Sequence, residues 1–418
     1  MMLMAGGLSG RRTTGGLVVT LLLMGIGCEE RWAGPSIEIV TLDGAEVTLV
    51  DSAGLSIVQS IAPAWKAGQS GWAVSSSPSL RIGSVDDSIL YLAGVRGVGL
   101  GPGGEVAVGN SLLNEVRTFS AQGEPRWRQG RRGAGPGEYE YILDLRECGD
   151  YLIVRDGAHR RLTILDWRGD VVLLRRYSAI REGTTPSALA CNRTGQFAQV
   201  DRKIGARAGA YLATAVVSTG DLMTGEGLIL SDSPGFLRYR IGNSDAPSDL
   251  GMQTLVGMSD SLVHVVVTDR AEILSYGLDG GLKRIIRWNV AARAIDPRFL
   301  KELATRRSGV LGPSLRAAYE RQWMELPHPD SLALVDRLLV SSDGELWLRQ
   351  FGGYQDPSEK TAWWVFSTAG AWLGTVLLPA GFDMVGVTPD AVFGVHRDET
   401  GVEFVEFRVV LRRNAVGQ

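Results

Sequence analysis

Basic side chains are concentrated between residues 131 and 207, and their chemistry is the recognition of anions. The planar guanidinium group of arginine presents paired N–H donors that match a carboxylate or a phosphate group. The candidate anion-binding residues are Arg131, Arg132, Arg155, His159, Arg160, Arg161, Arg202, Lys203 and Arg207. They predict a site for a phosphate, an acidic glycan or a carboxylate. The alternative is a solvated run of charge that pairs with Asp156 and Asp201.

The four histidines do not form a metal-ligand pattern. His264 lies within the apolar run LVHVVV, which is typical of a core histidine, and His328 lies between two prolines. The chain contains repeated units, which are described below. His159 and His396 lie in equivalent loops of two units that are not neighbours, so a first-row metal ion bound by both would need longer loops. We therefore predict no histidine metal site.

The carboxylates allow a calcium site as an alternative, but they form no catalytic motif. Calcium prefers oxygen ligands, and one class of loop carries Asp156, Asp201, Asp269, Asp356 and Asp398, although aspartate is also common in turns. The sequence contains no G-x-S-x-G, H-E-x-x-H or G-x-x-x-x-G-K motif. We assign no catalytic residue and no metal ligand, and treat calcium as an open alternative.

The N-terminal segment predicts export. Two arginines precede an apolar run over residues 17–26, which is too short for the roughly 20 residues that a transmembrane helix needs. Cys28 follows Gly27 directly, and this resembles the bacterial lipoprotein signal, in which such a cysteine carries the lipid. We expect residues 1–27 to be a signal peptide and Cys28 to be the lipid attachment site, in the periplasm or outer envelope. The alternative is plain secretion after cleavage nearby.

Composition excludes several classes of protein. The chain has 418 residues, of which 44% are hydrophobic and 21% charged, so it is neither intrinsically disordered nor a multi-span membrane protein. The 54 glycines follow no triplet period, which favours many tight turns between short strands. The formal net charge is −3, so we expect no nucleic-acid partner.

A repeated unit organises the chain from residue 80 onward. Each unit reads as four short strands with glycine turns, and the clearest copies span 95–130, 143–177 and 254–288. Equivalent positions are Glu105, Tyr151, Gln196, Leu262, Glu345 and Ala391, with spacings of 46, 45, 66, 83 and 46 residues. Four-stranded units of this length stack radially as propeller blades. The sequence therefore predicts an all-β, six-bladed β-propeller.

The last unit lacks chain for its fourth strand. Only 27 residues follow Ala391, whereas LRIG at 80–83 lies 25 residues before Glu105, the equivalent position of the first unit. We therefore expect residues 80–83 to pair with the C-terminal sheet, which would close the ring and remove an open edge. The expected organisation is 1–27 signal peptide, 28–78 tether and short hairpin, 79–413 propeller and 414–418 tail.

A family resemblance accompanies this pattern. GRRGAGPGEYEYI at 130–142 is similar to the junction of NHL repeats, and DSAGLSIV at 51–58 matches a segment that precedes the ring in six-bladed β-propeller bacterial lipoproteins. The resemblance covers about residues 47–413 and implies a fold without naming a substrate. In the propeller register Cys148 and Cys191 end the innermost strands of the second and third blades, so we expect a disulfide between them. Two buried free thiols are the alternative.

The insertions define a candidate binding face. The larger one, residues 291–328, predicts two helices between the fourth and fifth blades: Asp296 and Pro297 suit a helix start, and a second helix is expected over 314–325. We expect a helical hairpin that packs on the ring, with a lid or partner-binding element as the alternative.

These observations favour an exported, lipid-anchored propeller. We expect it to act as a non-enzymatic binding or scaffold module through the face that carries the insertions. The partner is expected to be a protein, a glycan or an anionic ligand, with the membrane contacted through the lipid only. The alternative is a propeller hydrolase or lyase of the sugar-lactonase type with a carboxylate-bound divalent cation.

Overall fold

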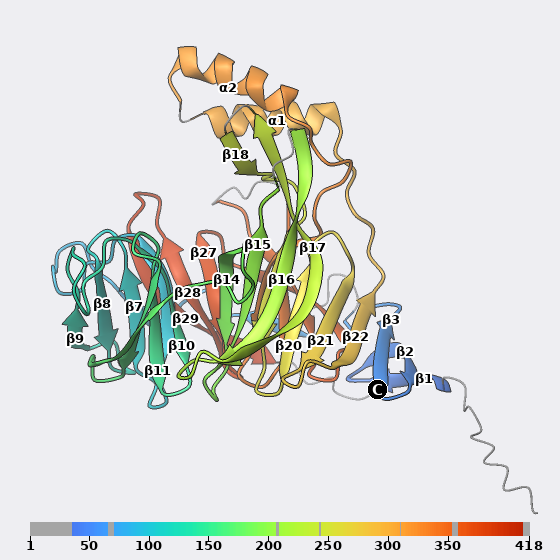
Figure 1. The fold of residues 1–418 in the computed structure, drawn as a ribbon, viewed down its shortest axis with the longest axis horizontal. Helices are drawn as coiled ribbons and strands as arrows, with labels where there is room; N and C mark the ends of the chain where they lie inside the picture. The colour runs from blue at the N-terminus through green and yellow to red at the C-terminus, as the bar shows by residue number, and fades with distance from the viewer. Residues whose placement is uncertain are drawn as a thin grey trace, which may run out of the picture. The chain divides into compact units, whose positions relative to one another are not determined.

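The computed structural model describes residues 36–65, 71–205, 209–241, 244–309, 311–352 and 358–412 (Figure 1). This part of the chain is an all-β propeller with two small helices. Several residues named above lie outside it: the leader 1–27, Cys28, Arg207, Asp356, the last expected propeller residue 413 and the tail 414–418.

The described strands form six sheets, numbered here in chain order. Sheet 1 contains β6 (Val95–Leu100), β7 (Val106–Asn110), β8 (Glu115–Phe119) and β9 (Pro125–Gln129). Sheet 2 contains β10 (Ile142–Cys148), β11 (Tyr151–Asp156), β12 (Arg161–Asp166) and β13 (Val171–Arg176). Sheet 3 contains β14 (Thr185–Cys191), β15 (Gln196–Lys203), β16 (Gly209–Asp221), β17 (Gly227–Ile241) and β18 (Ser244–Pro247).

The remaining sheets follow the same antiparallel order. Sheet 4 contains β19 (Thr254–Met258), β20 (Leu262–Val267), β21 (Glu272–Gly277) and β22 (Leu282–Trp288). Sheet 5 contains β23 (Val335–Val340), β24 (Leu346–Gln350), β25 (Thr361–Phe366) and β26 (Trp372–Leu378). Sheet 6 contains β27 (Phe382–Val387), β28 (Ala391–Arg397) and β29 (Glu403–Arg412).

The first strands of the sheets contact one another in a closed circuit. Contacts run from β6 to β10, β14, β19, β23 and β27, and β27 contacts β6 again. This circuit is the arrangement that defines a propeller. The strands approach closely, since a Cβ added to Gly97 of β6 would lie 2.1 Å from the carbonyl oxygen of Leu145 in β10.

The pairing of residues 80–83 with the C-terminal sheet is confirmed. β5 (Leu80–Ile82) pairs antiparallel with β29, with Ile82 opposite Val405 and Leu80 opposite Phe407. The sequence did not predict a further strand, β4 (Trp72–Val74), which pairs with the end of the same strand at Val410–Arg412. β29 has ten residues, so its edge is long enough for both short strands.

The N-terminal strands differ from the expected tether and short hairpin. β1 (Ser36–Leu42), β2 (Ala45–Ser52) and β3 (Leu55–Ser60) form an antiparallel three-stranded unit. β3 also pairs in parallel with β22, which extends sheet 4 outward. The physical reason is the open edge of β22, whose backbone groups gain partners when β3 adds to it.

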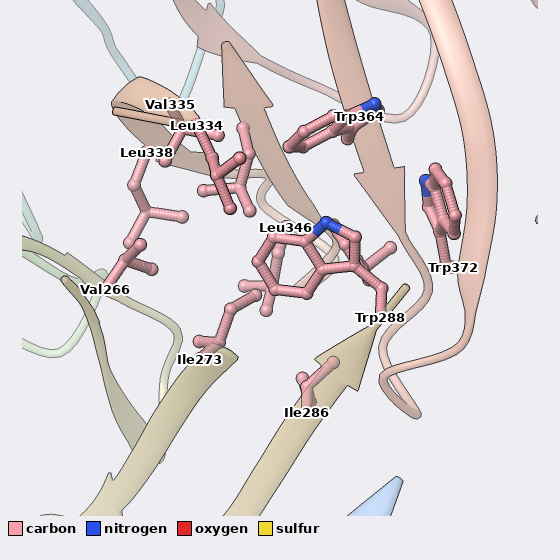
Figure 2. Close-up of a cluster of buried hydrophobic side chains, with 12 residues drawn as sticks. Val266, Ile273, Ile286, Trp288, Leu334, Val335, Leu338, Leu346, Trp364 and Trp372 are labelled. Atoms are coloured by element: carbon pink, nitrogen blue, oxygen red, sulfur yellow. The ribbon is translucent and has the colours of Figure 1, made fainter. Parts of the chain in front are cut away.

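The core lies between neighbouring sheets. Figure 2 shows one cluster, in which Trp288 from sheet 4 meets Trp364 and Trp372 from sheet 5. The ring of Trp288 lies 4.9 Å from that of Phe366 in an edge-to-face arrangement. Such packing of both faces of each sheet explains why a single unit could not be stable alone.

The insertion between sheets 4 and 5 is helical, as predicted. α1 (Pro297–Ser308) begins after Asp296, whose carboxylate accepts a hydrogen bond of 2.7 Å from the backbone N–H of Phe299. α2 (Pro313–Glu325) buries Trp323 against Leu303 of α1. Leu315, near the start of α2, is 63% exposed because α2 packs through one narrow face.

Candidate anion-binding site

One face of the propeller carries the segments that the sequence singled out. Successive strands in each sheet are antiparallel, so turns from second to third strands open on the same side as connections from fourth strands to the next sheet. We call this side the insertion face, because the α1–α2 connection from β22 to β23 belongs to it. Of the nine predicted basic residues, all but Arg207 lie at or beside such segments of sheets 2 and 3.

A hollow of about 430 Å³ lies on this face at the outer part of sheet 2. It is formed by the β11–β12 turn and the end of β13. We call it the basic hollow, and its lining is Ala158, His159, Arg160, Arg161, Leu174, Arg175 and Arg176. This lining contains five basic residues and no acid, so its electrostatic potential favours an anion.

Two arginines in the basic hollow stand directly opposite each other. Arg161 in β12 pairs in register with Arg176 in β13, and like charges at such positions repel. The guanidinium of Arg161 donates to the carbonyl oxygens of Ala134 and Glu138, and it lies 3.7 Å from the carboxylate of Asp156. Arg176 is exposed and makes no ion pair with any residue that the structure describes.

Arg160 is the second cation of the hollow without a partner. Its side chain is exposed and forms no hydrogen bond or ion pair within the described part of the chain. Its φ angle is 51°, a left-handed conformation that is uncommon for a residue other than glycine. Strain of this kind often persists at binding sites, where the surrounding structure holds a side chain in place.

Arg131 and Arg132 do not line the basic hollow, and both are paired with glutamate side chains. Arg131 pairs with Glu138 at 2.6 Å, and Arg132 pairs with Glu140 at 2.5 Å. Both arginines are largely exposed, so these ion pairs stabilise the connection between sheets 1 and 2 only weakly. This segment is a solvated run of paired charge, but its partners are Glu138 and Glu140 and not the expected Asp156 and Asp201.

Arg155 is also engaged within the protein. Its side chain is buried, and its Nη1 atom donates to the carbonyl oxygen of Ser187 at 3.2 Å, while its Cζ atom lies 5.3 Å from the ring centre of Tyr177. Burial raises the pKa of Tyr177, although the charge of Arg155 opposes this shift. Arg155 thus joins sheets 2 and 3 and is not available to a ligand in the basic hollow.

Arg202 and Lys203 lie at the end of β15 in sheet 3. Lys203 is exposed, whereas Arg202 is half-buried with its guanidinium 5.4 Å from the ring centre of Phe236. Neither residue lines the basic hollow. The predicted basic residues are therefore divided between two sheets.

A smaller hollow of about 250 Å³ lies where sheets 2 and 3 meet. It shares Arg175 and Arg176 with the basic hollow, and its apolar lining includes Leu162, Leu189 and Phe197. An anion held by the shared arginines would therefore find apolar surface beside it.

The sequence did not single out Arg175 and Arg176. They end the fourth strand of their unit, where polar residues are ordinary, and only the β12–β13 register places Arg176 opposite Arg161. The available signal was two consecutive arginines at the insertion-face end of a strand, next to a turn that already contained Arg160 and Arg161.

Asp156 and Asp201 have structural roles that explain their position. Asp156 accepts hydrogen bonds from the backbone N–H of Glu140 at 3.2 Å and from the ring of His159 at 2.7 Å. Asp201 accepts one from the backbone N–H of Ile180 at 2.9 Å. Each carboxylate thus fastens the connection from the preceding sheet.

The environments of these two carboxylates differ. Burial acts to raise the pKa of Asp156, but hydrogen bonds from His159 and Glu140 outweigh it and leave the pKa below its ordinary value. For Asp201, burial dominates over the hydrogen bonds and raises the pKa.

The four described aspartates of the calcium alternative belong to no common metal site. Asp398 caps its own turn by accepting from the backbone of Thr400 and Val402, and Asp269 lies 4.0 Å from Arg270. No group of three histidine, cysteine, aspartate or glutamate residues among those described could hold a metal ion.

Three of the four carboxylates on the first strands of the sheets pair with arginine. Asp144 lies 2.6 Å from Arg146, whose side chain is 45% exposed. On the other side of the ring, Arg349 bridges Asp336 at 2.7 Å and Asp383 at 3.1 Å. The fourth, Glu147, accepts a hydrogen bond from the backbone N–H of Leu100. Asp144, Asp336 and Asp383 therefore form ion pairs that join neighbouring strands and sheets.

Cys148 and Cys191 meet at the ends of β10 and β14, with their Cα atoms 5.3 Å apart. This separation lies within the range that a disulfide requires. His264 lies in the core, with Nδ1 2.9 Å from the hydroxyl of Ser275, as its apolar surroundings predicted. Burial lowers the pKa of His264 to about 3, so this ring is neutral at ordinary pH.

No helix in the described ranges has the length and hydropathy to cross a membrane. No protein-family model and no curated protein matches the chain. Among solved structures, the chain is similar to a putative exported protein from Bacteroides fragilis, with 11% identity and a TM-score of 0.48 over 82% of this chain and 95% of that one.

Two further structures resemble the chain to a similar degree. A member of the DUF4221 family from Bacteroides vulgatus has 9% identity and a TM-score of 0.48 over 82% of this chain and 99% of that one. A gluconolactonase from Xanthomonas campestris has 12% identity and a TM-score of 0.42 over 90% of this chain and 94% of that one. Similarities at this level assign no activity to the chain.

Proposed function

We propose that this protein is an exported binding module that holds an anionic ligand in the basic hollow of sheet 2. The observation that carries the proposal is a hollow of about 430 Å³ with five basic residues and no acid in its lining. Asp156 and two carbonyl oxygens engage Arg161, whereas Arg160 and Arg176 have no side-chain partner in the described ranges and can be balanced by an added negative charge. A phosphate, a carboxylate or an acidic glycan would supply that charge.

The ion pairs near the axis favour binding over metal-dependent catalysis. A sugar-lactonase type of site would need several free carboxylates around a divalent cation. Asp144, Asp336 and Asp383 instead lie within hydrogen-bond distance of arginine side chains. Their negative charge is already balanced, so we take the hydrolase or lyase as the weaker candidate.

The six sheets are proposed to be six blades of one ring, because their first strands contact one another in a closed circuit. The leader 1–27 and Cys28 support export with a lipid at Cys28, in the periplasm or outer envelope. A tethered propeller would present the insertion face to soluble ligands or to another protein of the envelope.

Retention on anionic matrices tests the proposed site. The double variant Arg160→Gln, Arg176→Gln removes the two unpartnered charges of the basic hollow. The matched control is Arg126→Gln, Arg128→Gln, which removes the same charge from exposed positions of β9. We expect the first variant to elute from a carboxylated and from a sulfated polysaccharide at lower salt than the control. Equal elution of the two variants would show that the basic hollow is not the binding site.

A further inference from the structure

Sheet 3 extends beyond the others on the insertion face. Its strands β16 and β17 have 13 and 15 residues, and β18 pairs with the end of β17 (Figure 1). The segment after β18 ties one face of β17 to the helical insertion: the N–H of Ser248 donates to the carbonyl of Leu237 at 2.7 Å, and Asp249 pairs with Arg307 of α1. These contacts hold the extended end of β17 against α1.

The opposite face of β17 presents arginines. Side chains alternate along a strand, so Arg238 and Arg240 share the face away from Tyr239. Arg238 Nε lies 2.5 Å from Asp245 Oδ1, and Arg240 Nη2 lies 3.0 Å from Asp245 Oδ2. The hydroxyl of Tyr211 donates to the same carboxylate.

We define the arginine cluster as Arg238 and Arg240, which pair with Asp245, together with Arg202 from β15. The guanidinium of Arg202 lies 5.4 Å from the ring centre of Phe236 in β17, two residues before Arg238. Burial lowers the pKa of Arg202, and the positive charge of Arg238 lowers it further. Burial acts to raise the pKa of Asp245, but the hydrogen bonds from Tyr211 and the arginines hold it below its ordinary value. Asp245 is therefore ionised at neutral pH.

The cluster contains more donors than acceptors. Arg238 Nη1, Arg202 Nε and Arg240 Nε are buried and have no hydrogen-bond partner in the described part of the chain. The side chain of Arg238 is only 6% exposed, so bulk water does not solvate it freely. A buried donor without an acceptor is costly, and more so when it is charged.

We propose that the arginine cluster is a binding site for a tetrahedral dianionic oxyanion, a phosphate or sulfate group. Arg238 and Arg240 share the carboxylate of Asp245, and Arg202 has no ion pair in the described ranges, which leaves two positive charges uncompensated. A tetrahedral dianion supplies that charge, and its oxygens can accept from several guanidinium groups at once. Ligand access is through Arg202 and Arg240, which are partly exposed, while Arg238 forms the floor.

This inference extends the proposed function by naming a second site and its ligand class. The arginine cluster shares no residue with the basic hollow. The two proposals can therefore fail separately. The helical insertion also acquires a role, since it holds β17 in the position that the cluster requires.

Calorimetric titration of the full exported chain tests the site at constant ionic strength and about pH 7.5. The probes are inorganic phosphate, sulfate, glycerol phosphate and acetate. At the arginine cluster we expect saturable binding of phosphate and of sulfate and none of acetate, because one negative charge is too few there. Tighter binding of glycerol phosphate than of phosphate would identify a phosphate ester as the ligand, and the reverse order would identify the free ion.

Variants locate the bound ion. Arg202→Gln should weaken phosphate binding by at least about tenfold, because it removes a charge-assisted donor. Arg202→Lys should weaken it less, because it keeps the charge and loses only the planar fork. Arg126→Gln, Arg128→Gln removes the same amount of charge outside both proposed sites, so it should bind phosphate as the parent does. Arg238→Gln is a second test wherever its thermal unfolding shows that it is folded.

Three outcomes would overturn the inference. The first is the absence of saturable heat with both oxyanions. The second is unchanged phosphate binding in Arg202→Gln and Arg238→Gln. The third is loss of phosphate binding in Arg160→Gln, Arg176→Gln alone, which would place the ion in the basic hollow and support the proposed function instead.

Discussion

The disulfide between Cys148 and Cys191 is open to a quantitative test. The two residues are 43 positions apart, and cross-linking them restricts the unfolded chain. The chain-entropy relation for a loop of that length gives a stabilisation of about 4 kcal/mol. Cys148 is fully buried at the junction of sheets 2 and 3, so the bond also ties together the two sheets that carry the proposed sites.

The perturbation is reduction during unfolding in guanidinium chloride. We expect a reducing agent to lower the free energy of unfolding by about 4 kcal/mol, seen as a lower midpoint of denaturation. The double variant Cys148→Ala, Cys191→Ala is the matched control, because a reducing agent should leave its midpoint unchanged. Peptide mapping without reduction should find a peptide that links the two cysteines.

Two results would refute this reasoning. Alkylation of both thiols in protein isolated from its exported compartment would show that the bond does not form. An unchanged midpoint on reduction, with the linked peptide present, would show that the bond does not restrict the unfolded chain as calculated. The first result would also weaken the case for an oxidising compartment.

Two further predictions concern stability. Below about pH 6.5 the unfolded chain binds a proton at His264, whereas the native state does not, because its His264 has a pKa of about 3. The free energy of unfolding should therefore fall by about 3 kcal/mol by pH 4.5. Denaturation across pH should show a shallower loss in His264→Gln, and an identical slope would contradict the role of His264. Gly97→Ala should lower the free energy of unfolding, measured by calorimetry, by about 1–3 kcal/mol, because the new Cβ would contact Leu145. Gly312→Ala is the control and should be nearly neutral, because nothing lies within 4 Å of its added Cβ. Equal effects of the two substitutions would contradict the close approach of β6 and β10.

Local patterns in the sequence were sufficient for the repeating architecture. Alternating apolar residues and glycine turns mark strands wherever they occur, so the expected second-strand starts at Tyr151 and Leu262 coincide with the starts of β11 and β20. The missing strand of the last unit was predictable by counting residues, and 80–83 pairs as expected. The helix start at Asp296 depended only on neighbouring residues.

The candidate sites depended on contacts that no local pattern contains. Arg176 became significant only through its register with Arg161, and Arg238 only through a β16–β17 extension whose register shifts at two irregularities. Sequence composition indicated an anion-binding segment around 131–207, but it could not say which charges were already paired. Arg131 and Arg132 were equal candidates in sequence, yet their partners Glu138 and Glu140 neutralise them.

The sequence by itself therefore determined the repeat, the closure of the ring and the concentration of positive charge, because these follow from short-range periodicity and counting. Only the tertiary structure decided which arginines keep unpaired donors, because pairing depends on which strands become neighbours. The arginine cluster illustrates this, since Arg202 in β15 and Phe236 in β17 are far apart in the chain and come together only across the extended hairpin of sheet 3.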